Sequence, residues 1–104
     1  MSYIKNILHE EHRRLQALCR KYMNKIDLLP KGTISIKKRK EREYLYLANR
    51  QGEKVRFTYI GSVTSEKARK LIEEINDRKN YQFKLNQVKK NIKEIGKALD
   101  GRKI

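Results

Sequence analysis

The chain has 104 residues, with 27 Lys and Arg against 12 Asp and Glu, a formal net charge of +15 at pH 7. This length fits one domain over residues 1–104 with a limited core, and the excess of positive charge favours polyanions such as nucleic acid as partners. The lone Cys19 excludes an internal disulfide, no apolar run reaches the ~20 residues of a membrane span, and the N-terminus lacks the apolar core of a signal peptide, so we expect a cytoplasmic protein that uses no membrane.

The first element expected is a long helix over residues 1–28. Apolar residues recur along it at spacings of three and four, which is typical of one apolar stripe on a helix. The stripe consists of Ile4, Leu8, Leu15, Leu18, Tyr22, Ile26 and Leu29. Pro30 should end the helix, because the residue before a proline disfavours the helical conformation.

Residues 32–61 are expected to form a three-stranded antiparallel sheet. Apolar and polar residues alternate there in short runs that are separated by polar residues or glycine, which is the pattern of strands joined by tight turns. The strands are predicted over residues 33–38, 43–49 and 54–60. The turns are predicted over 39–42 and 50–53, the second carrying Gly52 for a left-handed backbone position.

The sheet should have one apolar and one basic face, since successive side chains of a strand point to opposite sides. We expect Ile34 and Ile36 on the inner face, together with Val55, Phe57 and Tyr59. Either Leu45 and Leu47 or Tyr44 and Tyr46 join them, and the leucines are favoured because they carry no hydroxyl group that needs a partner. The outer face then holds Thr33, Ser35, Lys37, Tyr44, Tyr46, Lys54, Arg56 and Thr58.

A second long helix is expected over residues 64–100. Thr64 or Ser65 can cap its start, and the apolar residues near that start should pack against the sheet. Further on, a heptad seam runs through Tyr81, Leu85, Val88, Ile92, Ile95 and Leu99. These elements predict an α+β fold in which two long helices form an antiparallel coiled-coil hairpin with the small sheet inserted between them. A pair of helices has a thin core, so we also expect a homodimer through the helices.

The residue patterns of common enzyme and metal sites are missing from the sequence. His9 and His12 are spaced by three residues, whereas the zinc-protease motif needs a spacing of four. Nothing marks a base or an oxyanion site for Cys19, and there is no Gly-rich phosphate loop. We therefore expect no catalysis, no cofactor, no metal and no small-molecule substrate.

The strongest functional feature is the combination of cations and tyrosines in the predicted three-stranded meander, residues 32–61. Lys and Arg side chains can contact phosphates, while tyrosine rings can stack on bases or lie along sugars. We expect a nucleic-acid-binding protein, with DNA favoured over RNA. Its predicted contact residues are Lys37, Lys38, Arg39, Lys40, Arg42, Tyr44, Tyr46, Lys54 and Arg56. Tyrosine and lysine are also ordinary residues of a solvated sheet face, so the alternative is a coiled-coil interaction or assembly module whose charge keeps it in solution.

Several spaced motifs resemble a family of small uncharacterised prokaryotic proteins. The similar segments are Pro30 to Lys37, Tyr44 to Leu47, Gly52 to Arg56 and Tyr59-Ile60-Gly61, followed by the long charged helix. The resemblance implies the helix, meander, helix order and no particular activity. The basic meander also resembles the front ends of some transposases and the three-stranded arm-binding domains of integrases, an analogy of fold alone.

Overall fold

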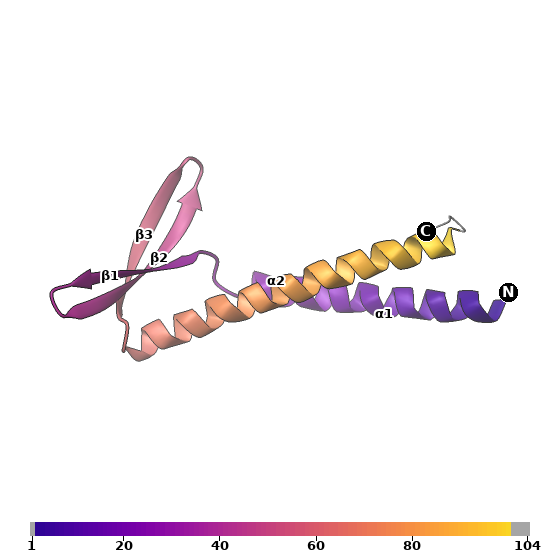
Figure 1. Cartoon of the computed structure of the whole chain (residues 1–104), viewed down its shortest axis with the longest axis horizontal. Helices are drawn as coiled ribbons and strands as arrows, with labels where there is room; N and C mark the ends of the chain where they lie inside the picture. Colours follow the sequence, from indigo (N-terminus) through magenta and orange to yellow (C-terminus); the bar gives the residue numbers. More distant parts are fainter. Residues whose placement is uncertain (1, 101–104) are drawn as a thin grey trace. The chain divides into compact units, whose positions relative to one another are not determined.

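The computed structural model describes residues 2–100, which fold as a helix, a three-stranded sheet and a second helix (Figure 1). Helix α1 spans Ser2–Asp27, strands β1, β2 and β3 span Thr33–Arg39, Arg42–Gln51 and Lys54–Ser62, and helix α2 spans Glu66–Leu99. The predicted α+β order is confirmed, and the strand ends shift only slightly outward. Among the described residues, no helix is both long and apolar enough to cross a bilayer.

The chain divides into two compact units, one formed by α1 with the part of α2 from Asn80 onward, the other by Leu28–Lys79. The expectation of a single domain stays a prediction. Because α2 runs through both units, its first turns belong to the sheet unit and its remainder to the helical unit.

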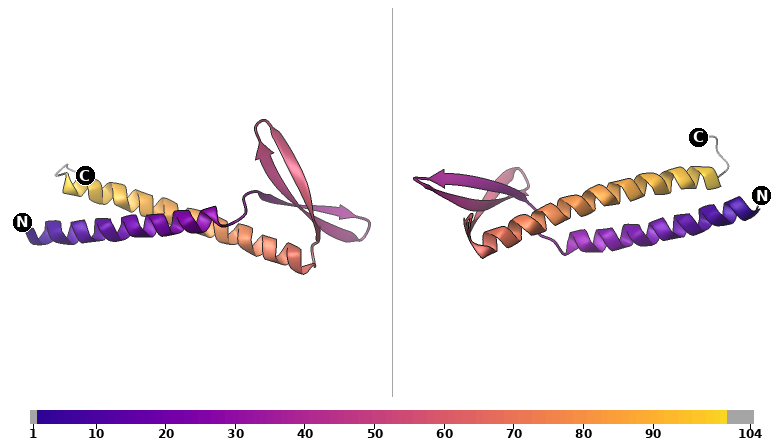
Figure 2. Two further views of the ribbon diagram at one scale, coloured as in Figure 1. Left: turned by 180° about the vertical axis from the view of Figure 1, so that it is seen from behind. Right: turned by 60° about the horizontal axis from the view of Figure 1, so that its bottom comes forward.

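In the helical unit, α1 and the later part of α2 run antiparallel and side by side (Figures 1 and 2). Leu15 and Ile26 of α1 and Leu85 and Val88 of α2 are buried, and they belong to the two apolar stripes that the heptad spacing predicts. Tyr22 and Tyr81, with ring centroids 5.9 Å apart, bridge the two helices. The stripe of α1 is not buried along its whole length, since Ile4 is 60% exposed.

The sheet unit has strand order β1-β2-β3, with both pairs antiparallel. Each hairpin has a two-residue loop, because Arg39 pairs with Arg42 and Gln51 with Lys54. Both loops use a left-handed backbone position, at Lys40 and at Gly52. Figure 1 shows the two hairpins sharing β2 and pointing in different directions, and the register shifts between Leu45 and Tyr46, where a β-bulge increases local twist.

Leu45 is the best-buried residue of the strands, at 0% exposure. The other buried side chains of its unit are Ala68 and Ile75, both on the first part of α2. This arrangement confirms that the leucine side of β2 is the inner face. Since most other strand residues are exposed or half-buried, the core of this unit is small.

The third strand forms where it was predicted, but the face predicted for its odd-numbered residues was wrong. Val55 and Phe57 lie opposite Arg50 and Ala48, and Tyr59 lies opposite Tyr46, so the odd-numbered residues of β3 share the side of the tyrosines rather than that of the leucines. The physical reason is the length of the loop. A loop with an even number of residues pairs odd-numbered positions of one strand with even-numbered positions of the next, and that pairing decides which side chains share a face.

Ser65 caps the start of α2, as one of the two predicted alternatives. Its hydroxyl accepts a hydrogen bond from the backbone N–H of Ala68 at 3.2 Å and donates one to the carbonyl of Ser62 at 2.7 Å. One of the free N–H groups of the first helical turn is thereby satisfied, and the chain leaving β3 is joined to the helix.

Candidate nucleic-acid interface

Four aromatic rings lie together on one side of the sheet, on β2 and β3. We call this side the aromatic face, and its rings are those of Tyr44, Tyr46, Phe57 and Tyr59. The ring of Tyr59 is at the centre, with its centroid 6.1 Å from that of Tyr44 and 5.4 Å from that of Tyr46. The interplanar angles of 49° and 64° are tilted and edge-to-face arrangements, which aromatic pairs prefer.

The rings are open to solvent to different degrees. Phe57 is 49% exposed and Tyr59 is 55% exposed, whereas Tyr44 and Tyr46 are half-buried. The tilted packing means that neighbouring rings do not cover each other face to face. A phenyl ring without a polar group, half exposed on a sheet whose other side faces the core, is apolar surface available for a ligand.

Lys37 of β1 places its ammonium group over two of these rings. Its Nζ lies 4.7 Å from the centroid of Tyr46 and 4.5 Å from that of Phe57. Both distances fall within the range of cation–π attraction, which contributes about 0.5–1 kcal/mol at exposed sites. All three strands therefore contribute to one cluster of a cation and aromatic rings.

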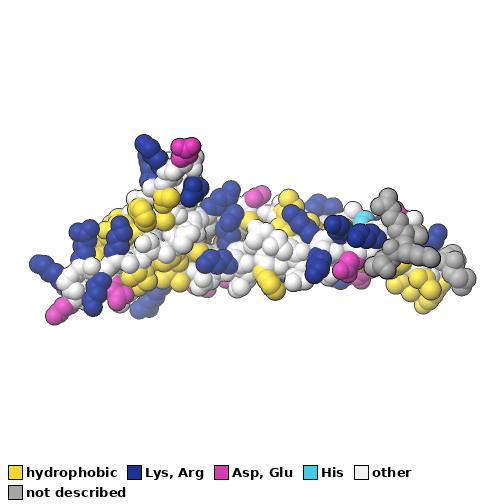
Figure 3. All heavy atoms as spheres, turned by 45° about the horizontal axis from the view of Figure 1, so that its top comes forward, with side chains coloured by type: hydrophobic (Ala, Val, Ile, Leu, Met, Phe, Trp, Pro, Cys, Tyr) yellow, Lys and Arg dark blue, Asp and Glu magenta, His cyan; other side chains and the backbone are white. Residues whose placement is uncertain are grey.

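More cations lie on the same side of the sheet as the aromatic rings, at the tip of the β1/β2 hairpin. Arg39 and Arg42 pair across the two strands on the side of Lys37 and Tyr44, and Lys40 lies in the loop between them. An open depression of about 640 Å³ is lined by Arg39, Lys40, Tyr44, Tyr46 and Tyr59. Figure 3 shows Lys and Arg side chains beside hydrophobic ones over the hairpins.

These cations are not neutralised by neighbouring carboxylates. Between Gly32 and Gly61 the sequence has eight Lys and Arg against three Glu. Within the part of the chain that the structure describes, the one ion pair joins Glu11 and Arg14 on α1, where the hydrogen bonds from the guanidinium to the carboxylate raise the pKa of Arg14. The Lys and Arg side chains of the sheet are therefore available to bind an anionic ligand.

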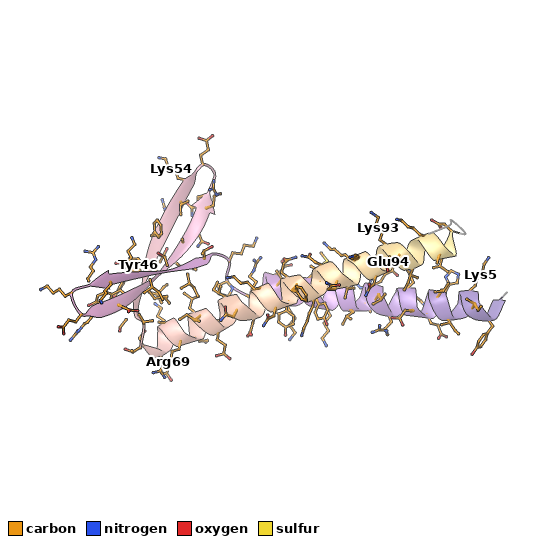
Figure 4. The ribbon with its side chains drawn as sticks, viewed as in Figure 1. Lys5, Tyr46, Lys54, Arg69, Lys93 and Glu94 are labelled. Atoms are coloured by element: carbon orange, nitrogen blue, oxygen red, sulfur yellow. The ribbon has the colours of Figure 1, made fainter. Side chains whose placement is uncertain are left out.

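The structure separates the predicted contact residues into two groups. Lys37, Arg39, Arg42, Tyr44 and Tyr46 share the aromatic face, with Lys40 at its edge in the loop. By contrast, Lys38, Lys54 and Arg56 alternate to the opposite side of their strands. Figure 4 shows Lys54 at the tip of the β2/β3 hairpin, away from Tyr46.

Three residues of this face are not among the predicted contact residues, namely Arg50, Phe57 and Tyr59. The sequence pattern predicts Phe57 and Tyr59 on the inner face and Arg50 in a turn, whereas Arg50 lies opposite Val55 on the aromatic face. The even length of the loop between β2 and β3 is the feature of the sequence that predicts their true side.

Comparison with known proteins identifies one family. No curated protein and no solved structure is significantly similar to the chain, so the likeness to transposase and integrase meanders has no support from relatives. A family model described as "Domain of unknown function (DUF6788)" matches residues 8–70. The match covers more than half of the chain and includes every residue of the aromatic face, in agreement with the expected resemblance to an uncharacterised family. The chain therefore belongs to the DUF6788 family.

Proposed function

We propose that this protein binds nucleic acid through the aromatic face and the basic β1/β2 hairpin, without catalysing a reaction, and that DNA is its preferred form. The observation that carries the proposal is the cation–aromatic cluster, in which Lys37 lies over two rings while Arg39 and Arg42 extend the same side. Phosphates and bases are the ligand groups that match unpaired cations and exposed rings on one surface.

The charge of the chain supports the same conclusion. A net charge of +15 attracts any polyanion at long range, but it does not define where the polyanion is held. The aromatic face supplies that place, because cations unpaired within the described residues are grouped there with apolar rings. The three cations of the opposite side, Lys38, Lys54 and Arg56, provide a control, because removing them changes the net charge as much as removing three cations of the hairpin tip.

The test is binding of the purified protein to a fluorescein-labelled DNA duplex, followed by anisotropy over a series of salt concentrations. Affinity should fall linearly in a plot of log K against log salt, with a slope that counts the phosphates contacted. A triple variant, Arg39→Gln, Lys40→Gln and Arg42→Gln, should reduce the magnitude of the slope by about one for each phosphate that it no longer binds.

The matched control removes three charges from the other side, by Lys38→Gln, Lys54→Gln and Arg56→Gln. It should reduce affinity much less than the hairpin variant. Equal losses from the two triple variants would show that net charge rather than this face holds the DNA. An absence of binding at low salt, to this duplex and to single-stranded DNA alike, would refute the proposed function altogether.

A second candidate function is self-assembly through the helical unit. It is favoured by apolar side chains that remain exposed there, among them Met23 at 46% and Phe83 at 65%, in a unit whose two helices bury few residues. Sedimentation equilibrium tests it. A concentration-dependent dimer that Phe83→Glu and Met23→Glu dissociate would support assembly, and a monomer throughout would exclude it.

A further inference from the structure

We infer that the aromatic face recognises unpaired bases, so that its ligand is a single-stranded nucleic acid bound by stacking. This inference rests on the proposed function and narrows it, from nucleic acid in general to strands whose bases are exposed. It concerns the rings at the centre of the face rather than the cations at its edge.

The first reason is the chemistry at the centre of the face. Direct reading of a duplex groove relies on side chains such as Asn, Gln and Arg that form paired hydrogen bonds with base edges. Here the central positions are Tyr44, Tyr46, Phe57 and Tyr59. The arginines of this side lie nearer the tips of the two hairpins, as Arg39, Arg42 and Arg50, and Asn49 and Arg56 lie opposite each other on the other side. Rings are suited to the faces of bases, which a duplex covers and a single strand exposes.

The second reason is exposure. Phe57 and Tyr59, 49% and 55% exposed, leave apolar ring surface in water, and contacts with phosphates alone would not require it. Stacking on a base covers such surface and is tolerant of sequence, because every base has a π-face. Phe57 has no hydroxyl, so its ring can interact with a ligand by stacking or apolar contact but not by a hydrogen bond from a hydroxyl group.

The third reason is the position of Lys37. Its ammonium occupies the space over Tyr46 and Phe57 at 4.7 and 4.5 Å from their centroids, which is where a stacked base would lie. A flexible lysine can leave the rings for the adjacent phosphate when a base arrives. The depression beside it, lined by Arg39, Lys40, Tyr44, Tyr46 and Tyr59, places two more cations within the same hollow as three rings.

The experiment compares three fluorescein-labelled probes at one salt concentration, namely a 12-nucleotide oligothymidylate, an abasic oligonucleotide of the same length and charge, and a 12-base-pair duplex. The oligothymidylate should bind at least about tenfold more tightly than the abasic strand, since loss of one stacked base commonly lowers affinity by about tenfold or more. Its binding should also quench tyrosine fluorescence, which can be observed directly because the chain has six Tyr and no Trp.

The variant Phe57→Leu with Tyr59→Leu keeps apolar side chains and removes two π-faces. It should lose about tenfold in affinity for oligothymidylate per ring and bind the abasic strand as before. The conservative variant Phe57→Tyr keeps a ring and should retain affinity, and this variant remains informative if the leucine variant folds poorly by circular dichroism.

The outcomes separate the two proposals. Equal affinity for oligothymidylate and the abasic strand, or tighter binding of the duplex than of oligothymidylate, would overturn stacking and leave the proposed function standing. No binding to any of the three probes would overturn both.

Discussion

Gly32 holds the start of β1 in a conformation that other residues rarely adopt, so Gly32→Ala should destabilise the sheet unit. Its φ of +132° lies in a region used almost only by glycine. A Cβ atom there would lie 2.6 Å from Asn49 Oδ1, 2.8 Å from Leu47 Cδ1 and 2.9 Å from the carbonyl oxygen of Ala48. The two side chains can rotate away, but the carbonyl belongs to β2, opposite Thr33 in the ladder.

The expected loss in the free energy of unfolding combines two effects. The strained backbone costs about 1–3 kcal/mol, and relief of the clash must shift the edge of the β1/β2 ladder, which weakens backbone hydrogen bonds worth about 1 kcal/mol each. We therefore expect a loss of about 3 kcal/mol for Gly32→Ala. A small domain is stable by only about 5–15 kcal/mol, so the change should be readily measured.

Gly52 provides the matched control, because it shares a positive φ without the crowding. Its φ is +65° and nothing lies within 4 Å of the position that a Cβ would take. Gly52→Ala should cost about 1 kcal/mol, the ordinary penalty of the left-handed region, and Gly52→Asn should cost less.

Urea unfolding followed by circular dichroism measures all three variants, with amide spectra to show whether the changes are confined to residues 28–79. If Gly32→Ala costs no more than Gly52→Ala, the crowding against Ala48 has no energetic consequence and the expected difference between the two glycines is refuted. Because β1 carries Lys37, Gly32→Ala should also weaken binding of nucleic acid at temperatures where the variant is still folded.

Two further predictions concern packing and capping. Leu45→Ala removes a side chain that is 0% exposed and should cost about 3 kcal/mol in urea unfolding, whereas Ile36→Ala, at a residue 51% exposed, should cost less than about 1 kcal/mol. The two residues lie opposite each other on the same side of the sheet, so similar losses would contradict the difference in burial between them. Ser65→Ala removes the acceptor for the Ala68 N–H and should lower stability by about 1 kcal/mol. Ser65→Thr keeps a hydroxyl that can both accept from Ala68 and donate to Ser62, so thermal unfolding should show it close to wild type, and equal losses in both variants would argue against the cap.

The elements of the fold were predictable because their causes are local. A spacing of three and four along α1 and along the seam of α2 is enough to predict two amphipathic helices, and alternation interrupted by Gly52 is enough to predict strands and a turn. Part of the candidate site was predictable for the same reason. Lys37, Arg39, Tyr44 and their neighbours lie close together in sequence, and a hairpin keeps them close in space.

The membership of the aromatic face depended on the pairing of β2 with β3. Phe57 and Tyr59 alternate with Arg56 and Thr58, so strand alternation alone allows either set to face the tyrosines. The register decides between them, and a shift of one residue would exchange every side chain of β3 between the two faces. The two-residue loop after Gln51 sets that register.

The amino-acid sequence alone determined the order of the elements, the excess of positive charge and the amphipathic stripes of both helices, because each depends on neighbours within a few positions. Only the tertiary structure decided that Leu45 is covered and that Tyr59 stays open, since burial depends on what packs against a face. It also brought Lys37 of β1 over Phe57 of β3, two residues on strands that do not pair with each other. That contact depends on the shared strand β2, whose pairing with both neighbours places the cation and the rings on one surface.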